Sequence, residues 1–487
     1  MTSYAMRALG VSAFALLLAG CPVGPNFVKP APEMPAEYRS DLGPAEAASF
    51  ADQAWFAVFH DAKLRELIET AIANNYDLRT AAARVEQAKH LVGVTRSEIF
   101  PQASYQGGAQ RGKSFAGPPF ELNGQTVGGV NRTFNTFLGA FSLAWEIDVW
   151  GRIRRATEAS EASLWATEDV RRGVVLSLVS GVAASYFALQ ELDLELEIAR
   201  NTTASFDDTV QLFTRRYEGG VDSKLSVERA KAARAEAAAT IPAIEQQIVQ
   251  QENAISVLLG RPPGPIPREP LLTRTALPPQ TPPGLPSQLL QRRPDILQAE
   301  RLIQAANAQV GVTVANFFPQ IGLTTLYGGQ SSDLDNIVKT PGAIWAIAGS
   351  VLGPIFQGGR LTESYRAAVA EWEGTKSVYE QTVLSALGEV SNALIAQQKL
   401  EEVKAQQEQQ VAALRESVRL ALLRYNGGLS SYFEVLEAQQ QLFPAELSLA
   451  ATDRDRLLAV VDLYRALGGG WAANDQPVEE PFWPQGP

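Results

Sequence analysis

Apolar residues recur at intervals of three and four over several long stretches of the chain, a pattern that predicts amphipathic helices. From residue 64 the apolar positions run Leu64, Leu67, Ile68 and Ala71, and the pattern ends at Pro101, because proline disfavours helical geometry in the residue before it. Asn74-Asn75 is a possible break within this first helix. The helices predicted in this way are about 64–100, 152–217, 222–259, 287–318, 360–425 and 430–467.

Between residues 101 and 150 the period changes from helical to two, which is typical of a strand with one apolar and one polar face. The large apolar positions are Phe137, Phe141, Leu143, Trp145, Ile147 and Val149, and small or polar residues alternate with them. A partner strand is expected to begin near Ala103, across a loop rich in Gly and Pro. The sequence therefore predicts one β-hairpin over about 101–150 and a second over about 319–358.

The chain contains an internal repeat. VGVTRSEIFPQ at 92–102 and VGVTVANFFPQ at 310–320 share seven of eleven residues at an offset of 218, and RYEGG at 216–220 returns as RYNGG at 424–428, at an offset of 208. Each copy holds a helix, a hairpin, a long helix and a return helix, and the two shorter helices are expected to stack end to end beside the long one. We predict a mainly α fold built from two tandem repeats, with long coiled-coil helices.

The predicted organisation follows from these patterns and from proline-rich segments, which favour extended chain. It comprises a signal peptide (1–20), an extended N-terminal arm (21–62), repeat 1 (63–260), a proline-rich linker (261–286), repeat 2 (287–470) and a C-terminal tail (471–487).

The N-terminus has the features of a bacterial export signal. Arg7 precedes an apolar run that ends in Leu-Ala-Gly-Cys at 18–21, and the run is too short to span a membrane. This ending resembles a lipobox, so we expect a covalent lipid on Cys21, the only cysteine, and no other cofactor. The alternative is an ordinary signal peptide with a chance cysteine.

Charge and motif content give no support to nucleic-acid binding or to enzymatic chemistry. The formal net charge is −11, whereas nucleic-acid binding requires a basic face. The sequence has two histidines, and it shows no metal-ligand spacing, phosphate-binding loop or nucleophile elbow. We therefore predict no catalytic residues, no metal site and no enzymatic activity.

Four strands with an apolar outer face cannot close a barrel alone, and an open edge in lipid would leave backbone groups unpaired. Three copies of the chain would supply twelve strands and a ring of long helices. The pattern therefore favours a membrane conduit.

The chain resembles the outer-membrane factors, the TolC/OprM-like lipoproteins of tripartite resistance-nodulation-division efflux systems. The segments that carry the resemblance are CPVGPNFVKP (21–30), the stretch 55–88, LAWEIDVWGRIRR (143–155), RRPDILQAERLIQAANAQVG (292–311) and RYNGGLSSYFEVLEAQQQL (424–442). The resemblance implies a homotrimer with a 12-stranded β-barrel in the outer membrane and a 12-helix α-barrel in the periplasm. It also implies a periplasmic adaptor protein, an inner-membrane pump that supplies the energy, and contact with outer-membrane lipid.

The resemblance further implies an acidic periplasmic entrance at Glu434 and Glu437, in the segment EVLEA. Glutamates three apart share a helix face, so three chains would place six carboxylates around one axis and favour cations. Alternatively, Ser431 and Glu434 form a capping box at the start of their helix. Ser430 stands where the family often carries a gating Arg.

The two RYxGG tips are also candidates for gate or adaptor contacts. The residues concerned are Tyr217, Gly219, Gly220, Tyr425, Gly427 and Gly428. Helix capping by the glycines is the alternative explanation. Pro242 and Pro444 are expected to kink or interrupt the return helices, and no function follows from them.

Two other functions stay open from the sequence. The same channel could serve type I protein secretion or metal efflux, since drug, metal and solvent substrates leave no separate signature here. In a different class, the chain could be a lipid-anchored periplasmic coiled-coil spacer without a pore, although such a protein would not need two matched hairpins.

Overall fold

The computed structural model describes residues 22–39, 61–113, 120–122, 125–127, 133–268 and 283–469. The predicted signal peptide, the predicted lipidation site Cys21, part of the arm, most of the linker and the predicted tail lie outside these residues. The described residues form two compact units, and each unit takes segments from both predicted repeats. We call them the sheet unit, which takes its described residues from 22–30, Glu86–Trp165 and Glu300–Val378, and the helical unit, which takes its described residues from Ala31–Val85, Ala166–Ala299 and 379–469.

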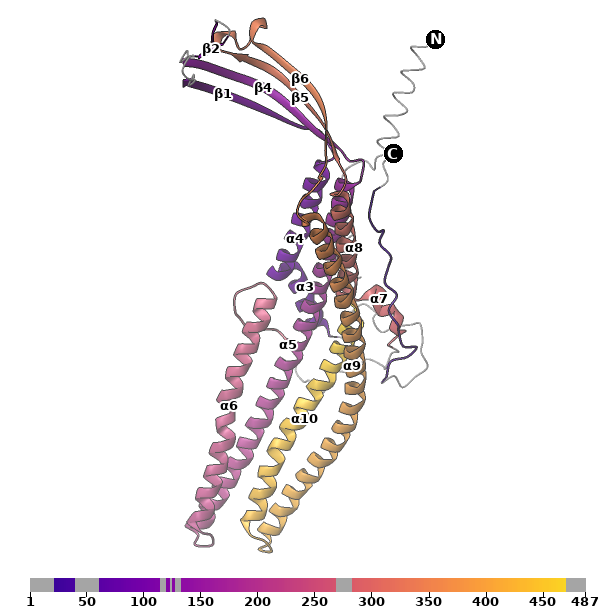
Figure 1. The fold of residues 1–487 in the computed structure, drawn as a ribbon. Helices are drawn as coiled ribbons and strands as arrows, with labels where there is room; N and C mark the ends of the chain where they lie inside the picture. The colour runs from indigo at the N-terminus through magenta and orange to yellow at the C-terminus, as the bar shows by residue number, and fades with distance from the viewer. Residues whose placement is uncertain are drawn as a thin grey trace. The chain divides into compact units, whose positions relative to one another are not determined.

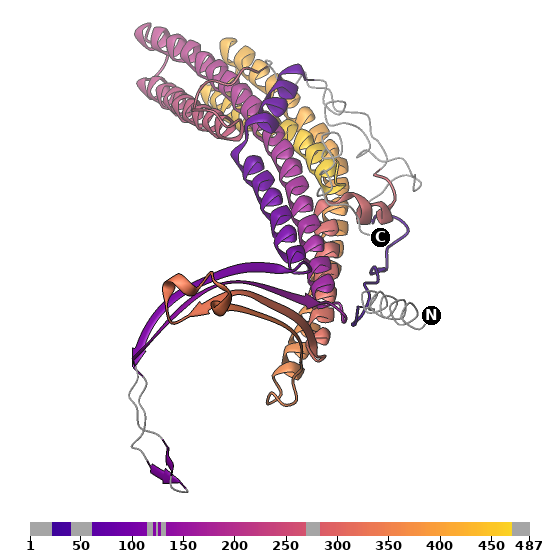
Figure 2. The ribbon, with the colours of Figure 1, turned by 90° about the horizontal axis from the view of Figure 1, so that it is seen from above.

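The sheet unit is built around one antiparallel sheet with the strand order β1-β4-β5-β6, and this sheet is strongly curved (Figure 2). Its strands are β1 (Gln102–Lys113), β4 (Thr133–Ile147), β5 (Gln320–Ser331) and β6 (Ala343–Leu352), and a separate small pair comprises β2 (Phe120–Leu122) and β3 (Gln125–Val127). Both predicted hairpins are therefore confirmed, as β1–β4 and β5–β6. Strands β1 and β6 form the two edges of the sheet.

An aromatic row crosses all four strands on one face of the sheet. Tyr105 pairs with Phe141, Phe141 with Tyr327, and Tyr327 with Trp345. These four side chains are between 70% and 83% exposed. Large exposed apolar side chains in one contiguous row mark a surface that normally contacts lipid or another protein.

The helical unit is organised around two antiparallel helix pairs, the larger part of α5 with α6 and the larger part of α9 with α10, which run side by side (Figure 1). Their bounds are α5 (Arg152–Glu218), α6 (Lys224–Leu258), α9 (Arg360–Asn426) and α10 (Tyr432–Ala466). Each long helix has 67 residues, or about 100 Å at 1.5 Å per residue. One apolar stretch of α5 is long enough to cross a membrane, but 61% of it is buried, as in a core helix.

The short helices that precede each hairpin are interrupted. In repeat 1 the chain forms α3 (Ala62–Asn74) and α4 (Tyr76–Ser97), so the suggested break at Asn74-Asn75 is confirmed. In repeat 2 it forms a 3-10 turn, η3 (Pro286–Gln288), then α7 (Leu289–Arg292) and α8 (Pro294–Ala315). The prediction of one continuous helix over 287–318 is wrong, because Pro294 disfavours helical geometry in the residue before it. Two further 3-10 turns, η4 (Leu334–Asn336) and η5 (Thr340–Gly342), lie between β5 and β6.

The two interruptions bind the ends of the return helices in the same way. Asn75 Nδ2 donates a hydrogen bond of 3.0 Å to the carbonyl of Leu258, and Arg293 Nη1 donates one of 2.8 Å to the carbonyl of Ala466. The carbonyls at a helix C-terminus lack intrahelical partners, so each bond satisfies one of them. Each return helix therefore meets the start of the short helix of its own repeat, as end-to-end stacking requires.

The two prolines within the return helices do not end them. Pro242 lies inside α6 and Pro444 inside α10, and both helices continue past the proline. The expectation that these residues would interrupt the helices is therefore wrong, and the alternative, a kink at each proline, stays a prediction. Packing of the apolar faces outweighs the local loss of one backbone hydrogen bond at each site.

The beginning of the N-terminal arm is fixed to the sheet unit. Val23 N–H donates to the carbonyl of Trp150 over 3.0 Å, and Arg155 Nη2 donates to Asn26 Oδ1 over 2.7 Å. Gly24 has a left-handed φ of 97°, and a Cβ there would lie 2.5 Å from the Cα of Gly311. Backbone packs directly on backbone at this point, which only glycine allows.

Candidate pore entrance at the helical tip

The two helix pairs of the helical unit end in turns of the same design. After α5, Val221 N–H donates to Arg216 O and Gly220 N–H to Tyr217 O; after α9 the same two bonds link Leu429 to Arg424 and Gly428 to Tyr425. This is the Schellman arrangement, which needs a left-handed residue after the helix. The φ values of Gly220 (73°) and Gly428 (71°) meet that need, so helix capping accounts for the second glycine of each pair.

A cluster of buried side chains joins the two turns, and we call it the tip cluster. It draws residues from all four long helices: Phe206 and Phe213 of α5, Val227, Ala230, Ala233 and Ala237 of α6, Ala421 and Tyr425 of α9, and Tyr432, Val435 and Leu436 of α10. The ring of Phe213 lies 3.9 Å from that of Tyr432 and 5.3 Å from that of Tyr425, centroid to centroid. Small alanines on α6 let the helices approach closely. The tip is therefore one packed structure rather than two independent turns.

A hydrogen bond between two side chains links the polar edges of the two turns. Tyr425 Oη donates to Asp222 Oδ2 over 2.8 Å, and the guanidinium of Arg216 lies 4.4 Å from the centroid of the Tyr425 ring. We call the Tyr425–Asp222 bond the tip latch. It connects the end of α9 with the residue that precedes the N-cap of α6, Ser223. Within one chain, this bond crosses from repeat 1 to repeat 2.

The latch holds both of its groups in the protonation states that the bond requires. Partial burial favours the neutral form of Asp222, but hydrogen bonds from Tyr425, Ser226 and the N–H of Ser223, with the charge of Arg216, outweigh burial and lower its pKa. Burial raises the pKa of Tyr425, and although the Arg216 guanidinium lowers it, the bond to the Asp222 carboxylate adds to the rise. The donor therefore keeps its proton while the acceptor stays ionised.

The two predicted entrance glutamates lie on the exposed face of α10. Buried Tyr432, Val435 and Leu436 occupy the opposite face, while Glu434 and Glu437 are exposed. The alternative of a capping box at Ser431 is wrong, because the Ser431 side chain accepts no capping bond. The Glu434 carboxylate instead lies 3.6 Å from Arg424 Nε.

The predicted tip tyrosines are not equivalent in the structure. Tyr217 is 44% exposed, whereas Tyr425 is 6% exposed and forms the latch. The repeat offset of 208 explains the difference, because Asp222 in repeat 1 corresponds to Ser430 in repeat 2. Ser430 Oγ is buried and has no hydrogen-bond partner among the residues that the structure describes.

Sequence reasoning identified Tyr425 but missed Asp222 and Arg216 as its partners. The available signal was the position of Asp222, one residue before a Ser N-cap and directly after the first turn. Gly219 and Gly427, the first glycines of each pair, have no left-handed φ. Their assignment as contact residues stays a prediction.

The sequence and the fold both match a known family of channels. The family model described as outer membrane efflux protein matches residues 67–261 and 285–469, one match over each predicted repeat. Antibiotic efflux pump outer membrane protein ArpC of Pseudomonas putida is 33% identical over 97% of this chain and 99% of its own length. Cation efflux system protein CusC of Escherichia coli (strain K12) is 32% identical over 94% of this chain and 98% of its own length.

Among solved structures, the outer-membrane channel OprN superposes with a TM-score of 0.83 at 30% identity, over 93% of this chain and 100% of that chain. Because the family model matches most of this chain and the fold is shared with a solved channel, the chain belongs to the outer membrane efflux protein family.

Proposed function

We propose that three copies of this chain close a twelve-stranded barrel through the free edges of β1 and β6. One observation carries the proposal: the four-stranded sheet presents an exposed aromatic row and ends in two edge strands. In lipid such edges must pair, and aromatic residues are enriched where barrels meet the membrane interface. The barrel would lie in the outer membrane as a passive exit duct, with the long helices extending into the periplasm.

The cargo that best fits the relatives is a toxic small molecule. One relative is named as an antibiotic efflux protein and another as a cation efflux protein, so both drug and metal-ion export are supported. We propose that an inner-membrane resistance-nodulation-division pump and a periplasmic adaptor deliver the cargo. No feature of the described residues and no relative named above specifically supports the alternative of type I protein secretion. A coiled-coil spacer without a pore leaves the exposed aromatic row without a role.

We propose further that the helical tip is the periplasmic entrance and that the tip latch helps to hold it closed. In a trimer, Glu434 and Glu437 would contribute six carboxylates to one ring. The exposed position of both side chains on α10 supports this role. Tyr217 and the first glycine of each tip pair remain candidates for contact with the adaptor, and Cys21 remains the proposed lipid attachment site.

The test is the ion selectivity of the Glu434→Gln, Glu437→Gln double variant in a planar bilayer under a salt gradient. Neutralising the ring should move the reversal potential towards zero, because the cation preference depends on its charge. A matched control removes two glutamates of similar exposure elsewhere, as Glu408→Gln and Glu416→Gln, and should leave the potential unchanged. Equal selectivity in both double variants would refute the entrance role of these glutamates while leaving the channel in place.

A further inference from the structure

The sheet unit contains two junctions between strand and helix that the internal repeat makes directly comparable. Arg152 opens α5 and Arg360 opens α9, at the repeat offset of 208. Each follows a glycine with left-handed geometry, Gly151 with φ 78° and Gly359 with φ 88°. The two arginines therefore occupy equivalent places, and each lines a cavity.

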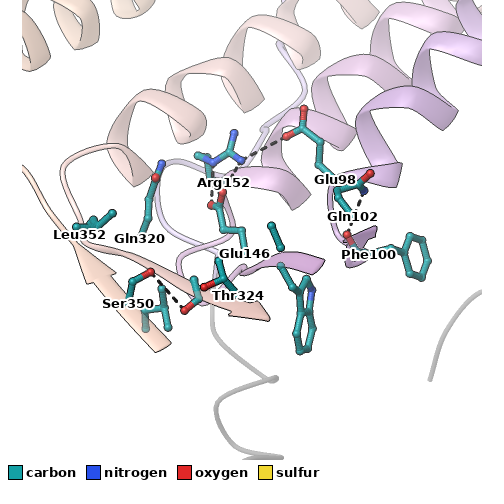
Figure 3. A pocket seen from close by; sticks show the side chains of 13 residues that line it. Glu98, Phe100, Gln102, Glu146, Arg152, Gln320, Thr324, Ser350 and Leu352 are labelled. Carbon is teal, nitrogen blue, oxygen red and sulfur yellow. Dashed lines mark hydrogen bonds and ion pairs between the residues drawn. The ribbon is translucent and has the colours of Figure 1, made fainter. Parts of the chain in front are cut away.

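In repeat 1 carboxylates of the same repeat neutralise this position (Figure 3). Arg152 donates through Nε and Nη2 to the two oxygens of Glu146, over 3.0 and 2.9 Å, and through Nη2 to Glu98 over 3.3 Å. Asp148 accepts bonds from the first N–H groups of α5, those of Ile153 (3.2 Å) and Arg154 (3.0 Å). Three carboxylates thus surround one guanidinium and one helix N-terminus.

Repeat 2 keeps the arginine and lacks all three carboxylates. The residues that correspond to Glu98, Glu146 and Asp148 are Asn316, Pro354 and Phe356. Arg360 Nη2 donates to Gln357 Oε1 over 2.5 Å, and no ion pair joins it to a carboxylate of the part of the chain that the structure describes. The acid one turn further along, Glu363, is paired instead with Arg366 over 2.9 Å.

The cavity beside Arg360 is suited to a small anion. Its volume is about 430 Å³, and none of the described residues that line it is an Asp or a Glu. Asn316, Gln320 and Ser364 contribute side chains that can donate hydrogen bonds. Guanidinium binds carboxylate and phosphate oxygens strongly, through parallel N–H donors, and the start of α9 adds a positive dipole end. In repeat 1 the protein's own carboxylates satisfy the same groups.

We propose that this cavity, which we call the Arg360 cavity, binds an oxyanion, either a carboxylate or a phosphate. Gln320 and Leu352, which line it, pair across β5 and β6 and share a sheet face with Gly322 and Ser350. Tyr327 and the aromatic row lie on the opposite face. If the barrel of the proposed function forms, the Arg360 cavity therefore opens to its lumen, and this part of the inference rests on that function.

The anion comes from solution rather than from a neighbouring copy. In repeat 1 the adjacent strand contributes Gln320, Ile321 and Gly322 to the Arg152 cavity. The equivalent segment that a second copy would bring to the edge of β6 is Gln102, Ala103 and Ser104, at the repeat offset of 218. None of these three is acidic. The ligand class is thus an anionic solute, such as a cargo molecule with a carboxylate or phosphate group.

The experiment is a titration of the purified full-length mature protein in detergent with inorganic phosphate, followed calorimetrically at low ionic strength. We expect one site per chain. Arg360→Gln should weaken binding at least about tenfold, since it removes the charged donor. Asn316→Glu should weaken phosphate binding similarly. The new carboxylate would stand where repeat 1 has Glu98, and it would pair with the Arg360 guanidinium in place of the phosphate. Arg366→Gln, the matched loss of one positive charge on the same helix, should change the affinity by less than about twofold.

Two results would overturn the proposal: no phosphate binding by the wild-type protein, or equal binding by the Arg360→Gln variant. A second readout separates the site from the channel. Phosphate should reduce the bilayer current of the wild-type protein and not that of Arg360→Gln. Binding that leaves a measurable current unchanged would overturn the lumenal position of the site. Intact binding without any current in any variant would count against the channel and not against the anion site.

Discussion

Removal of one hydroxyl from the tip latch should open the channel. Tyr425→Phe deletes the bond to Asp222 and keeps the aromatic ring that packs against Phe213 and Arg216. A hydrogen bond to a charged acceptor contributes about 1.5–3 kcal/mol. Because Asp222 is only half-buried, we take about 1 kcal/mol per chain as the working value.

If the proposed trimer opens as a unit, its three chains would together lose about 3 kcal/mol, which corresponds to a rise of about 100-fold in the ratio of open to closed tips. The assay is the single-channel open probability in a planar bilayer. Tyr217→Phe is the matched control, since it removes the same atom from the exposed tyrosine of the other turn. Equal open probability in the two variants would refute the latch. Asp222→Asn, which keeps the side-chain size and removes the charge, should shift the open probability in the same direction as Tyr425→Phe.

The remaining predictions concern pH, the turns and the arm. The latch carboxyl has a pKa below its usual 3.8, so its contribution is present above that value and is lost as the pH falls through the lowered pKa. The latch tyrosine has a pKa above 10.0, and its contribution is lost only as the pH rises through that raised value. The open probability should therefore be constant from about pH 5 to 9 and should rise below about pH 4; a change between pH 5 and 9 would contradict this. Gly220→Ala and Gly428→Ala should each destabilise the helical tip by about 1–2 kcal/mol, because both residues have a left-handed backbone. Gly219→Ala should cost less than about 0.5 kcal/mol. Hydrogen exchange of the backbone amides at the turns measures the loss of stability in each variant. Gly24→Ala should detach the arm, since the new Cβ would collide with the backbone of Gly311. Trypsin should then cleave the arm faster than in the wild type. An unchanged cleavage rate would show that the contact does not hold the arm.

Local patterns predicted most of the fold. The spacing of Val411, Leu414, Val418, Ala421 and Tyr425 predicts a packed seam, and all five are buried or half-buried in α9, as is Leu422. The alternation of apolar and polar residues predicted both hairpins. These features depend on neighbours three, four or two residues away, and the sequence shows such neighbours directly.

The misses have a common physical origin in tertiary contacts. The RYxGG motif has the same form in both turns, so nothing local distinguishes Tyr217 from Tyr425. Only the packing of one helix pair against the other places Tyr425 beside Asp222. The spacing of Ser431 and Glu434 alone favours a capping box. In the structure the Glu434 carboxylate lies near Arg424 across the turn instead, a contact that the local sequence does not show. The helix break before Pro294 could have been predicted from the proline alone.

The internal repeat gave information that neither copy gives alone. It aligned Asp222 with Ser430, and thus explained why the chain contains one latch and not two. It also aligned Arg152 with Arg360, and so showed which carboxylates are absent beside the second arginine.

The ion conductance of the purified mature protein in a planar bilayer tests most directly whether this chain forms a channel. We expect discrete current steps with a preference for cations, small in the wild type and larger or more frequent in Tyr425→Phe. Absence of current steps above those of the protein-free membrane, in both the wild type and the latch variant, would contradict a channel.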